Sequence, residues 1–511
     1  VYLDNNIAKK DGFYMNNLQS VFELLQEGKI ASSTADVKVY EKSYKEHEGV
    51  RLLMVKTESK KYILATGNGD IYNDLQGEAV GENGKACPLT HENRLVLNKY
   101  FDYTLPRAFG TKVATIGLGD RLGLASPGHI ETVRDRNVKP VLAQQSIREL
   151  TLTNRTMDDL IDAAAFAVFQ EGYEGGYGAD GDHIKLESDI QKALDLGFSM
   201  LTLDCSDYIP TGIDSKSLEE VRADFEKLPE DVKKYYNEHY LDKTFDVNGL
   251  TLSFDEETLI KYVLEYHEAI TYMVHVYDEY ISKLGRDFDF EISIDETETI
   301  TSPMAHFFVA NELTSKGVKV ISLAPRFCGE FQKGIDYIGD VEQFEKELSE
   351  HALIAEHFGY KLSIHSGSDK FKVFPIIAKY TKGVVHVKTA GTNWLEAVRV
   401  IAKTNPKLYR RMHQFALDNF EETLKYYHVT PDLDSIDALD SVQDADLPNY
   451  MDDDAARQLL HVTYGLILSE KDENGAFVFK EEFYKTLDEH EEEYTNALVK
   501  HIGKHLDKLG M

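Results

Sequence analysis

Residues 172–207 decide the fold of this chain: they read GYEGGYGADGDHIK (172–185), LESDIQKALDLG (186–197) and FSMLTLDCSD (198–207). The first and third segments are apolar or glycine-rich runs of strand length that end in acidic and polar residues, and the middle segment has the length of a helix. Strand, helix and strand, with charged groups at the carboxyl ends of the strands, form the repeating unit of α/β enzymes.

The same unit recurs on both sides of that stretch. Strand-like runs alternate with helix-like runs from Lys112 onward, and we predict strands at 112–119, 139–147, 172–185, 198–207, 288–296, 318–327, 360–368 and 384–391. Eight such repeats predict an α/β fold, a (β/α)8 barrel of the TIM type. The run GLGDRLG at 117–123 departs from the dinucleotide fingerprint, so we do not predict a nicotinamide site.

Composition divides the chain into three regions. In residues 1–110, runs in which apolar and polar residues alternate are separated by turn residues, and this pattern predicts an N-terminal β-rich region. Residues 111–404 form the predicted catalytic barrel, with a polar insertion at about 210–255. Residues 405–511 have a helical pattern rich in acids, and we expect this C-terminal helical region to pack around the barrel or to lie in a subunit interface.

The charge, hydropathy and cysteine content of the chain indicate which partners and which compartment to expect. A net charge of −32 at pH 7 repels a phosphate backbone, so nucleic acid is not expected, and no apolar run approaches the ~20 residues of a membrane span. The three cysteines are scattered without a CxxC pair, which suits a reducing cytoplasm. We therefore expect a cytoplasmic protein that acts on a small molecule without a membrane partner, and a homo-oligomer stays open.

Alternation along the strands separates residues that face the barrel interior from those that face the helices. In five strands the outward positions are apolar, whereas the inward positions are small or polar and end in a charge. The inward residues are Thr202 and Asp204, Ser293 and Asp295, Ser322 and Arg326, Ser363 and His365, and His386 and Lys388. We expect their charged ends to meet at the carboxyl ends of the strands, where TIM barrels bind substrate.

Acids and imidazoles that meet in one cup, the hollow at the carboxyl ends of the strands, offer the ligands of a divalent metal. The identity of the metal stays open among Zn, Mn, Ni and Co. The predicted ligands are His183, His365 and one carboxylate of the Asp180/Asp182 pair, assigned to Asp180. Strict alternation turns His183 away from those acids, so this site requires the strand to end or bulge near Gly181. The alternative is that both histidines are satisfied core residues or donors to sugar hydroxyls.

The remaining acids suit proton transfer. Asp182, Asp204 and Asp295 are predicted to be catalytic, because the segment DETE at 295–298 holds more acid than a metal requires. Stabilisation of the start of the next helix explains the charge at Glu296 or Glu298 equally well.

Four further residues are predicted to bind substrate: Gln145, Arg326, His386 and Lys388. Arg326 is the preferred anion receptor, because a planar guanidinium matches a carboxylate. Lys388 could assist it, could form a Schiff base, or could form a structural ion pair with a neighbouring aspartate.

Several long blocks of the predicted barrel are distinctive: QQSIRELTLTNRT (144–156), GYGADGDHIK (176–185), MLTLDCSDYI (200–209), SIDETETITSP (293–303), HFFVANEL (306–313), SLAPRFCGEFQKGIDYIGD (322–340), IHSGSDKF (364–371) and VHVKTAGTNW (385–394). At these residues the sequence resembles the tagaturonate epimerase family (UxaE) of bacterial hexuronate catabolism. The resemblance covers about Lys112 to Lys403 and extends more weakly toward both ends.

This resemblance implies a metal-dependent isomerase that interconverts D-tagaturonate and D-fructuronate by inverting one secondary alcohol carbon. Members of the family also resemble catalysts used on D-fructose and D-tagatose. A bound metal would acidify a C–H group beside the ketose carbonyl, whereas inversion farther away needs a retro-aldol step or a transient oxidation. The rival hypotheses are a class II metal-dependent aldolase or a ketose isomerase on the same barrel, a Schiff-base aldolase and, fitting least well, a non-enzymatic sugar-binding protein.

Overall fold

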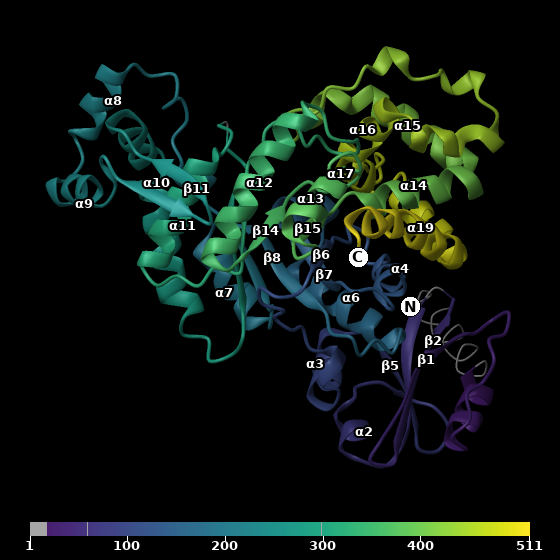
Figure 1. The fold of residues 1–511 in the computed structure, drawn as a ribbon. Coiled ribbons are helices and arrows are strands. Elements are labelled where there is room, and N and C mark those ends of the chain that lie inside the picture. The colour runs from purple at the N-terminus through teal and green to yellow at the C-terminus, as the bar shows by residue number, and fades with distance from the viewer. Residues whose placement is uncertain (1–17, 59, 298) are drawn as a thin grey trace.

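The computed structural model describes residues 18–58, 60–297 and 299–511, and at its centre eight parallel strands close into a barrel (Figure 1). The strands are β6 (Thr115–Leu118), β7 (Lys139–Ser146), β8 (Gly178–Ile184), β9 (Met200–Asp204), β12 (Asp289–Ile294), β13 (Ser322–Pro325), β14 (Lys361–Ile364) and β15 (His386–Thr389). They follow one another around the barrel in chain order, and β15 pairs with β6 to close it. The predicted (β/α)8 barrel is confirmed.

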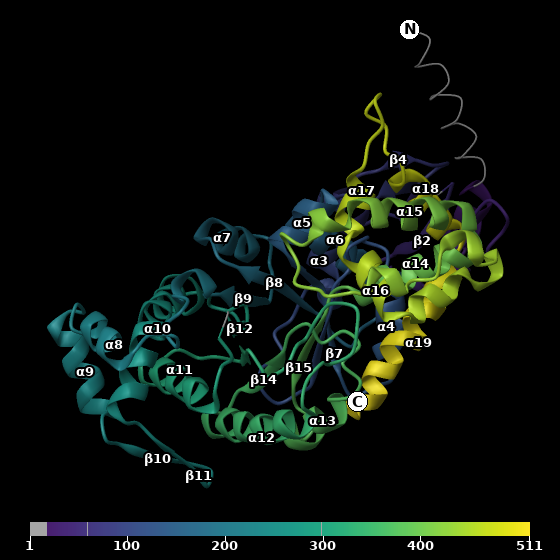
Figure 2. The same cartoon turned by 90° about the horizontal axis from the view of Figure 1, so that it is seen from above.

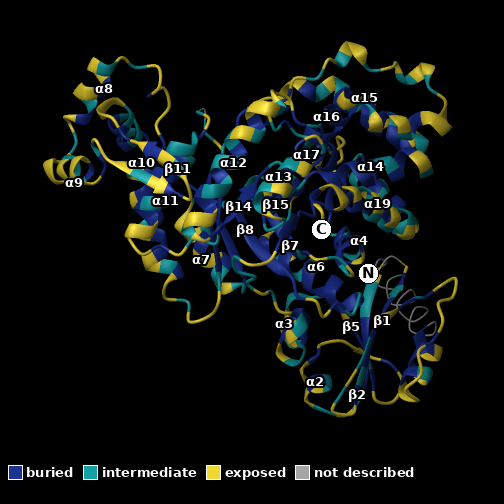
Figure 3. Cartoon of the chain, viewed as in Figure 1, coloured by how far each residue is buried: buried dark blue, intermediate teal, exposed yellow. Residues whose placement is uncertain are grey.

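Helices follow the barrel strands and cover their outer face. They are α4 (Ser126–Val133), α5 (Ile147–Thr153), α6 (Met157–Gln170), α7 (Glu187–Asp195), α10 (Glu256–Val276), α11 (Pro303–Ser315), α12 (Val341–Phe358), α13 (Phe374–Thr381) and α14 (Thr392–Thr404). Thr156 and Ser302 cap α6 and α11, each accepting a hydrogen bond from the first turn. The outward-facing Leu201 and Leu203 are fully buried in this layer, and the barrel is the most buried part of the chain (Figure 3).

The strand β8 departs from regular geometry at its carboxyl end. Its pairing with β9 shifts register between Gly181 and Ile184, and His183 has a φ of 52°, in the left-handed region. An irregularity of this kind interrupts the alternation of side chains, so His183 need not point away from the face that Asp180 and Asp182 share. The bulge that the sequence required near Gly181 is therefore present.

A five-stranded antiparallel sheet precedes the barrel, as the N-terminal pattern predicted. Its strands are β1 (Lys38–His47), β2 (Val50–Thr57), β3 (Lys60–Gly67), β5 (Gly84–Pro88) and β4 (Glu78–Ala79), in that spatial order, with the helices α2 (Asp70–Asp74) and α3 (His91–Tyr100) beside them. One face of the sheet packs against Phe166 and Phe169 of α6, which joins this layer to the outside of the barrel.

The polar insertion between β9 and α10 forms an arm that projects from one side of the barrel (Figures 1 and 2). It contains α8 (Leu218–Phe225), α9 (Glu230–Tyr240) and a hairpin of β10 (Thr244–Val247) and β11 (Leu250–Ser253). The sequence predicted a polar insertion at about 210–255 but not the hairpin within it. Aromatic residues anchor the arm, since the fully buried Tyr240 contacts Phe254 and Phe308.

The C-terminal region packs on the opposite side of the barrel (Figure 2). Its helices are α15 (Pro406–Asn419), α16 (Asp454–Val462), α17 (Tyr464–Ser469), α18 (Lys480–Glu489) and α19 (Glu491–Leu509). The single tryptophan, Trp394 of α14, is fully buried between the two parts: its indole N–H donates to the Leu460 carbonyl at 2.8 Å and its ring stacks on Phe483. Among the described helices, none combines the length and the apolar character that crossing a membrane requires.

Glu491, the first residue of α19, joins the C-terminal region to the N-terminal sheet. Its carboxylate lies 3.0 Å from the ammonium of Lys38, 3.0 Å from that of Lys56 and 3.5 Å from that of Lys61. Although burial favours the neutral acid, these three lysines lower the pKa of Glu491 to about 2. The carboxylate thus stabilises the fold in its charged form.

We predict that Glu491→Gln lowers the free energy of unfolding at pH 7 by about 1–3 kcal/mol, because partly buried lysines lose their shared counter-ion. A folded-state pKa below that of the unfolded chain means that the stabilisation is present above about pH 4.3 and is lost as the pH falls toward 2. Denaturant unfolding at pH 7 and pH 3 measures both effects. The difference between parent and variant should shrink at pH 3, and Glu492→Gln, a change at an exposed neighbour, should match the parent at both values.

Candidate active site

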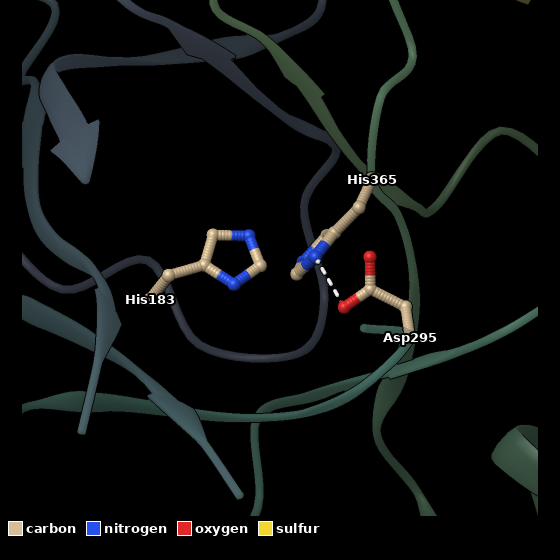
Figure 4. Close-up of side chains that lie close together, drawn as sticks. All are labelled: His183, Asp295 and His365. Carbon is tan, nitrogen blue, oxygen red and sulfur yellow. Dashed lines mark hydrogen bonds and ion pairs between the residues drawn. The ribbon is translucent and has the colours of Figure 1, made fainter. Parts of the chain in front are cut away.

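Three predicted site residues meet at the carboxyl ends of the barrel strands: His183 from β8, Asp295 just after β12 and His365 just after β14 (Figure 4). Each offers one ligand atom, and the three atoms lie within 4.8 Å of one another. The Nδ1 of His365 lies 3.0 Å from Asp295 Oδ1, and the rings of His183 and His365 are 4.9 Å apart, edge to face. Two imidazoles and a carboxylate form a donor set that suits a divalent transition metal.

Unpartnered polar atoms beside this cluster also fit a metal. His183 Nδ1 and Asp204 Oδ2 are buried and 3.7 Å apart, and neither has a hydrogen-bond partner in the described part of the chain. Such orphaned atoms are costly unless an ion, a water or a small shift completes them. A ring nitrogen of His183 directed at Asp204 leaves the other nitrogen available, which is the usual arrangement of a ligating histidine and the acid behind it.

Carboxylates crowd these imidazoles and hold protons on them. Burial favours a neutral ring, but the carboxylates of Asp182 and Asp204 raise the pKa of His183 to about 10. Asp295 likewise raises the pKa of His365 against the effect of burial. A divalent cation would replace the protons, so the charge of the cluster suits metal binding.

Asp180 does not join the cluster, and Asp295 takes the place that the sequence assigned to it. The carboxylate of Asp180 lies deeper in the barrel, where Lys388 Nζ donates to it at 2.8 Å and Thr202 Oγ1 donates at 2.9 Å. Burial raises the pKa of Asp180 to about 6. Asp180 does not join the cluster because the neighbouring Lys388 ammonium holds it in an ion pair deeper in the barrel.

Lys388 forms the structural ion pair that was one of its three predicted roles. Its ammonium lies 2.8 Å from Asp180, 2.7 Å from Asp182 and 2.9 Å from Glu291. Although burial favours the neutral amine, these carboxylates raise its pKa well above the ordinary value. A protonated amine is not a nucleophile, so this geometry argues against a Schiff base at Lys388.

Glu291 is a site residue that the sequence analysis missed. It lies on β12 two positions before Ser293, fully buried, and its Oε1 is 2.8 Å from His365 Nε2. It therefore connects Lys388, through His365, to the cluster of candidate metal ligands. The sequence contained a sign of it, because Glu291, Ser293 and Asp295 occupy alternate positions of the strand and therefore face the same side, the barrel interior.

Two predicted substrate-binding residues lie away from the cavity. Gln144, not Gln145, lines it and donates to Asp182 Oδ2 at 2.7 Å, whereas Gln145 accepts from Arg155 on the outer side. The pairing of β7 shifts register before these residues, which changes the side that each one faces. His386 is buried inside the barrel with its Nδ1 2.8 Å from Thr115 Oγ1, and burial lowers its pKa to about 3.

The cavity above the cluster has an inner and an outer part. The inner part has a volume of about 50 Å³ and is lined by Asp182, His183, Asp295, His365 and Lys388, together with Glu296. The outer pocket has a volume of about 330 Å³ and is lined by Arg326, by segment 329–333 and again by Asp295, Glu296 and His365. Arg326 thus lies on the outer wall, and Asp204 lies behind His183 without lining either part. Glu298 lies outside the described residues.

The C-terminal region supplies part of the cavity wall. Tyr427 and His461 line the inner part, although both follow the last barrel strand by many residues. His461 packs so closely on Gly391 that a Cβ at that glycine would lie 1.9 Å from the ring. No local pattern in the sequence indicates this contact, because only the tertiary fold brings α16 to the barrel.

The family of the chain follows from its overall similarity to known proteins. The profile of the UxaE family, described as tagaturonate epimerase, matches residues 40–509. A tagaturonate/fructuronate epimerase from Thermotoga maritima is 43% identical over 476 residues, which cover 92% of this chain and 96% of that protein.

Crystal structures of the fructuronate-tagaturonate epimerase UxaE from Cohnella laeviribosi share the fold. The native structure is 59% identical with a TM-score of 0.91, and the alignment covers 93% of this chain and 97% of that one. The complex with one glycerol is 58% identical with a TM-score of 0.92, and the alignment covers 97% of this chain and 99% of that one. Similarity of this extent, over the barrel and both flanking regions, shows that the chain belongs to the tagaturonate epimerase family.

Proposed function

We propose that the protein interconverts D-tagaturonate and D-fructuronate in a metal-dependent reaction. The observation that carries the proposal is the cluster of His183, Asp295 and His365 at the floor of a cavity at the carboxyl ends of the strands. Relatives that cover nearly the whole chain are named for this epimerisation, which supports the choice of substrate. Neutral ketohexoses such as D-tagatose, a cytoplasmic location and a homo-oligomer stay predictions.

The protein residues have distinct tasks in this proposal. His183, His365 and Asp295 would hold the metal, which supplies Lewis acidity toward a carbonyl or hydroxyl oxygen. Asp182 faces the cavity as an anion, because Lys388 and Gln144 both donate to it. Burial opposes this charge, yet Lys388 lowers the pKa of Asp182 to about 2. We assign it to accept a hydrogen bond, and transiently a proton, from a substrate hydroxyl.

Asp204 supports this arrangement from behind. Its Oδ1 accepts from the Ser206 backbone N–H at 2.9 Å, which leaves Oδ2 directed at His183. We therefore assign Asp204 to orient His183, and Asp295 to bind the metal instead of transferring protons.

The position of the inverted carbon favours a retro-aldol route. Fructose and tagatose differ in configuration at C4, which is not adjacent to the C2 carbonyl, so its C–H bond is not acidified. Loss of the C4 hydroxyl proton to a base such as Asp182 can instead break the C3–C4 bond: C4 becomes an aldehyde carbon, and the electron pair of the broken bond passes through C3 to the C2 carbonyl oxygen as an enolate. Rotation of the resulting aldehyde presents its other face, the bond forms again, and the proton returns to the new C4 oxygen, so that atoms and electrons balance.

Metal dependence gives a prediction about activity. Exhaustive chelation should abolish turnover of tagaturonate, and adding back Zn, Mn, Ni or Co one at a time should restore it with at least one of them. His183→Ala and His365→Ala should each lose more than about 100-fold in both metal affinity and kcat/KM. Elemental analysis and a coupled assay measure these quantities.

His275→Ala serves as the matched control, because that histidine is exposed on α10 and its partners in the described structure, Glu187 and Tyr272, line neither part of the cavity. Full metal content and full activity in both site variants would show that the metal is bound elsewhere.

Isotopic labels test the route. A reaction run in D2O should give product without deuterium at C4, because the retro-aldol step retains that hydrogen on the aldehyde. Substrate deuterated at C4 should show no primary isotope effect, whereas oxidation at C4 would break that bond and give one. Deuterium at C4 would instead establish simple deprotonation, and release of two three-carbon fragments would identify an aldolase.

A further inference from the structure

We propose that the ammonium of Lys333 binds the substrate carboxylate and thereby favours uronates over neutral ketohexoses. This inference rests on the proposed function and adds a specificity residue to it. Variants of Lys333 and Arg326 distinguish this role of Lys333 from a role of Arg326, and the metal content of each variant distinguishes it from metal binding.

The charges that line the inner cavity single out Lys333. Four lysine and arginine side chains lie there, and three of them face acids: Arg121 lies 2.6 Å from Glu149, Arg148 lies 3.7 Å from Glu296, and Lys388 is surrounded by three carboxylates. Lys333 forms no ion pair with any described residue. Its Nζ donates to Ser366 Oγ at 2.9 Å, which leaves further N–H groups for a ligand.

The backbone around Lys333 is held in place. The ammonium of the fully buried Lys370 donates to both ends of segment 332–335, at 2.8 Å to the first carbonyl and 2.6 Å to the last. Arg457 of α16 donates to the carbonyl of Gly334 at 2.7 Å. Lys333 therefore extends from a rigid segment, which lowers the entropy lost when a ligand binds its ammonium.

Lys333 lies where the two parts of the cavity meet, because it lines both of them. The inner part, at about 50 Å³, has room for only a few water molecules, so a six-carbon sugar acid must extend into the outer pocket. A substrate whose oxygens lie at His183 and His365 would then pass Lys333, since Ser366 follows His365 directly in the chain.

The environment of Lys333 also lacks the anion that would stabilise its charge. Burial lowers the pKa of Lys333, and the nearby Glu149 offsets this only in part. A substrate carboxylate would form a charge-assisted hydrogen bond with the ammonium, whereas a neutral ketohexose would leave it uncompensated. Arg326 also forms no ion pair with a described residue, but it lines only the outer pocket, so it is the natural comparison.

The test compares Lys333→Met, Lys333→Arg and Arg326→Met in the metal-loaded enzyme, with Lys319→Met, a change at an exposed lysine outside both parts of the cavity, as the control. Lys333→Met should raise the KM for tagaturonate about 10- to 100-fold with a smaller change in kcat, and Lys333→Arg should recover most of that loss. Metal content and melting temperature should match the parent, Arg326→Met should raise KM less than Lys333→Met does, and Lys319→Met should leave KM unchanged. Calorimetry with a mixture of tagaturonate and fructuronate equilibrated by the enzyme gives an apparent Kd without net turnover.

The outcomes separate the two hypotheses. An unchanged KM and Kd in Lys333→Met would refute the role of Lys333, and a large effect in Arg326→Met alone would transfer that role to Arg326. A parent enzyme that binds tagaturonate without converting it would refute the proposed function, while the Kd values would still decide about Lys333. If Lys333→Met is less stable than the parent, Lys333→Gln provides the same comparison with a polar side chain.

Discussion

The ion pairs between one ammonium and three carboxylates hold the centre of this barrel together. Lys388 on β15 forms ion pairs with Asp180, Asp182 and Glu291, which come from the opposite side of the barrel and are buried, and its charge offsets part of theirs. Buried carboxylates without a cation would repel one another or take up protons. The ammonium therefore fixes both the position and the charge of the acids on which the site is built.

That arrangement extends to the candidate metal ligands through hydrogen bonds. Glu291 contacts Lys388 on one side and His365 Nε2 on the other, and His365 Nδ1 faces Asp295. The two ring nitrogens of His365 are thus both directed at acids, and the ring orientation follows from the barrel interior. A site supported in this way is rigid before substrate arrives, which is how enzymes avoid reorganisation during catalysis.

The sequence predicted the barrel well because alternation is a local property. Each strand carries its own inward and outward pattern, and the same rule placed Asp295 and His365 at the cup. It assigned Asp180 to the metal, whereas the structure places Asp180 deeper, in the ion pair with Lys388, because pattern alone does not give depth along a strand. It chose Gln145 for substrate binding, whereas Gln144 lines the cavity, because the register shift in β7 has no local signature. His183 was the informative exception, since its position at the cup required a bulge that the backbone contains.

The wall formed by Tyr427 and His461 has a consequence for biosynthesis. Both residues follow β15, so a nascent chain can complete all eight barrel strands while residues beyond 389 are still within the ribosome. At that stage the candidate metal ligands His183, Asp295 and His365 lie in or directly after completed strands, but the residues that form one wall of the cavity have not yet emerged. The order of synthesis therefore supplies the candidate ligands before the wall that the C-terminal region adds to the cavity.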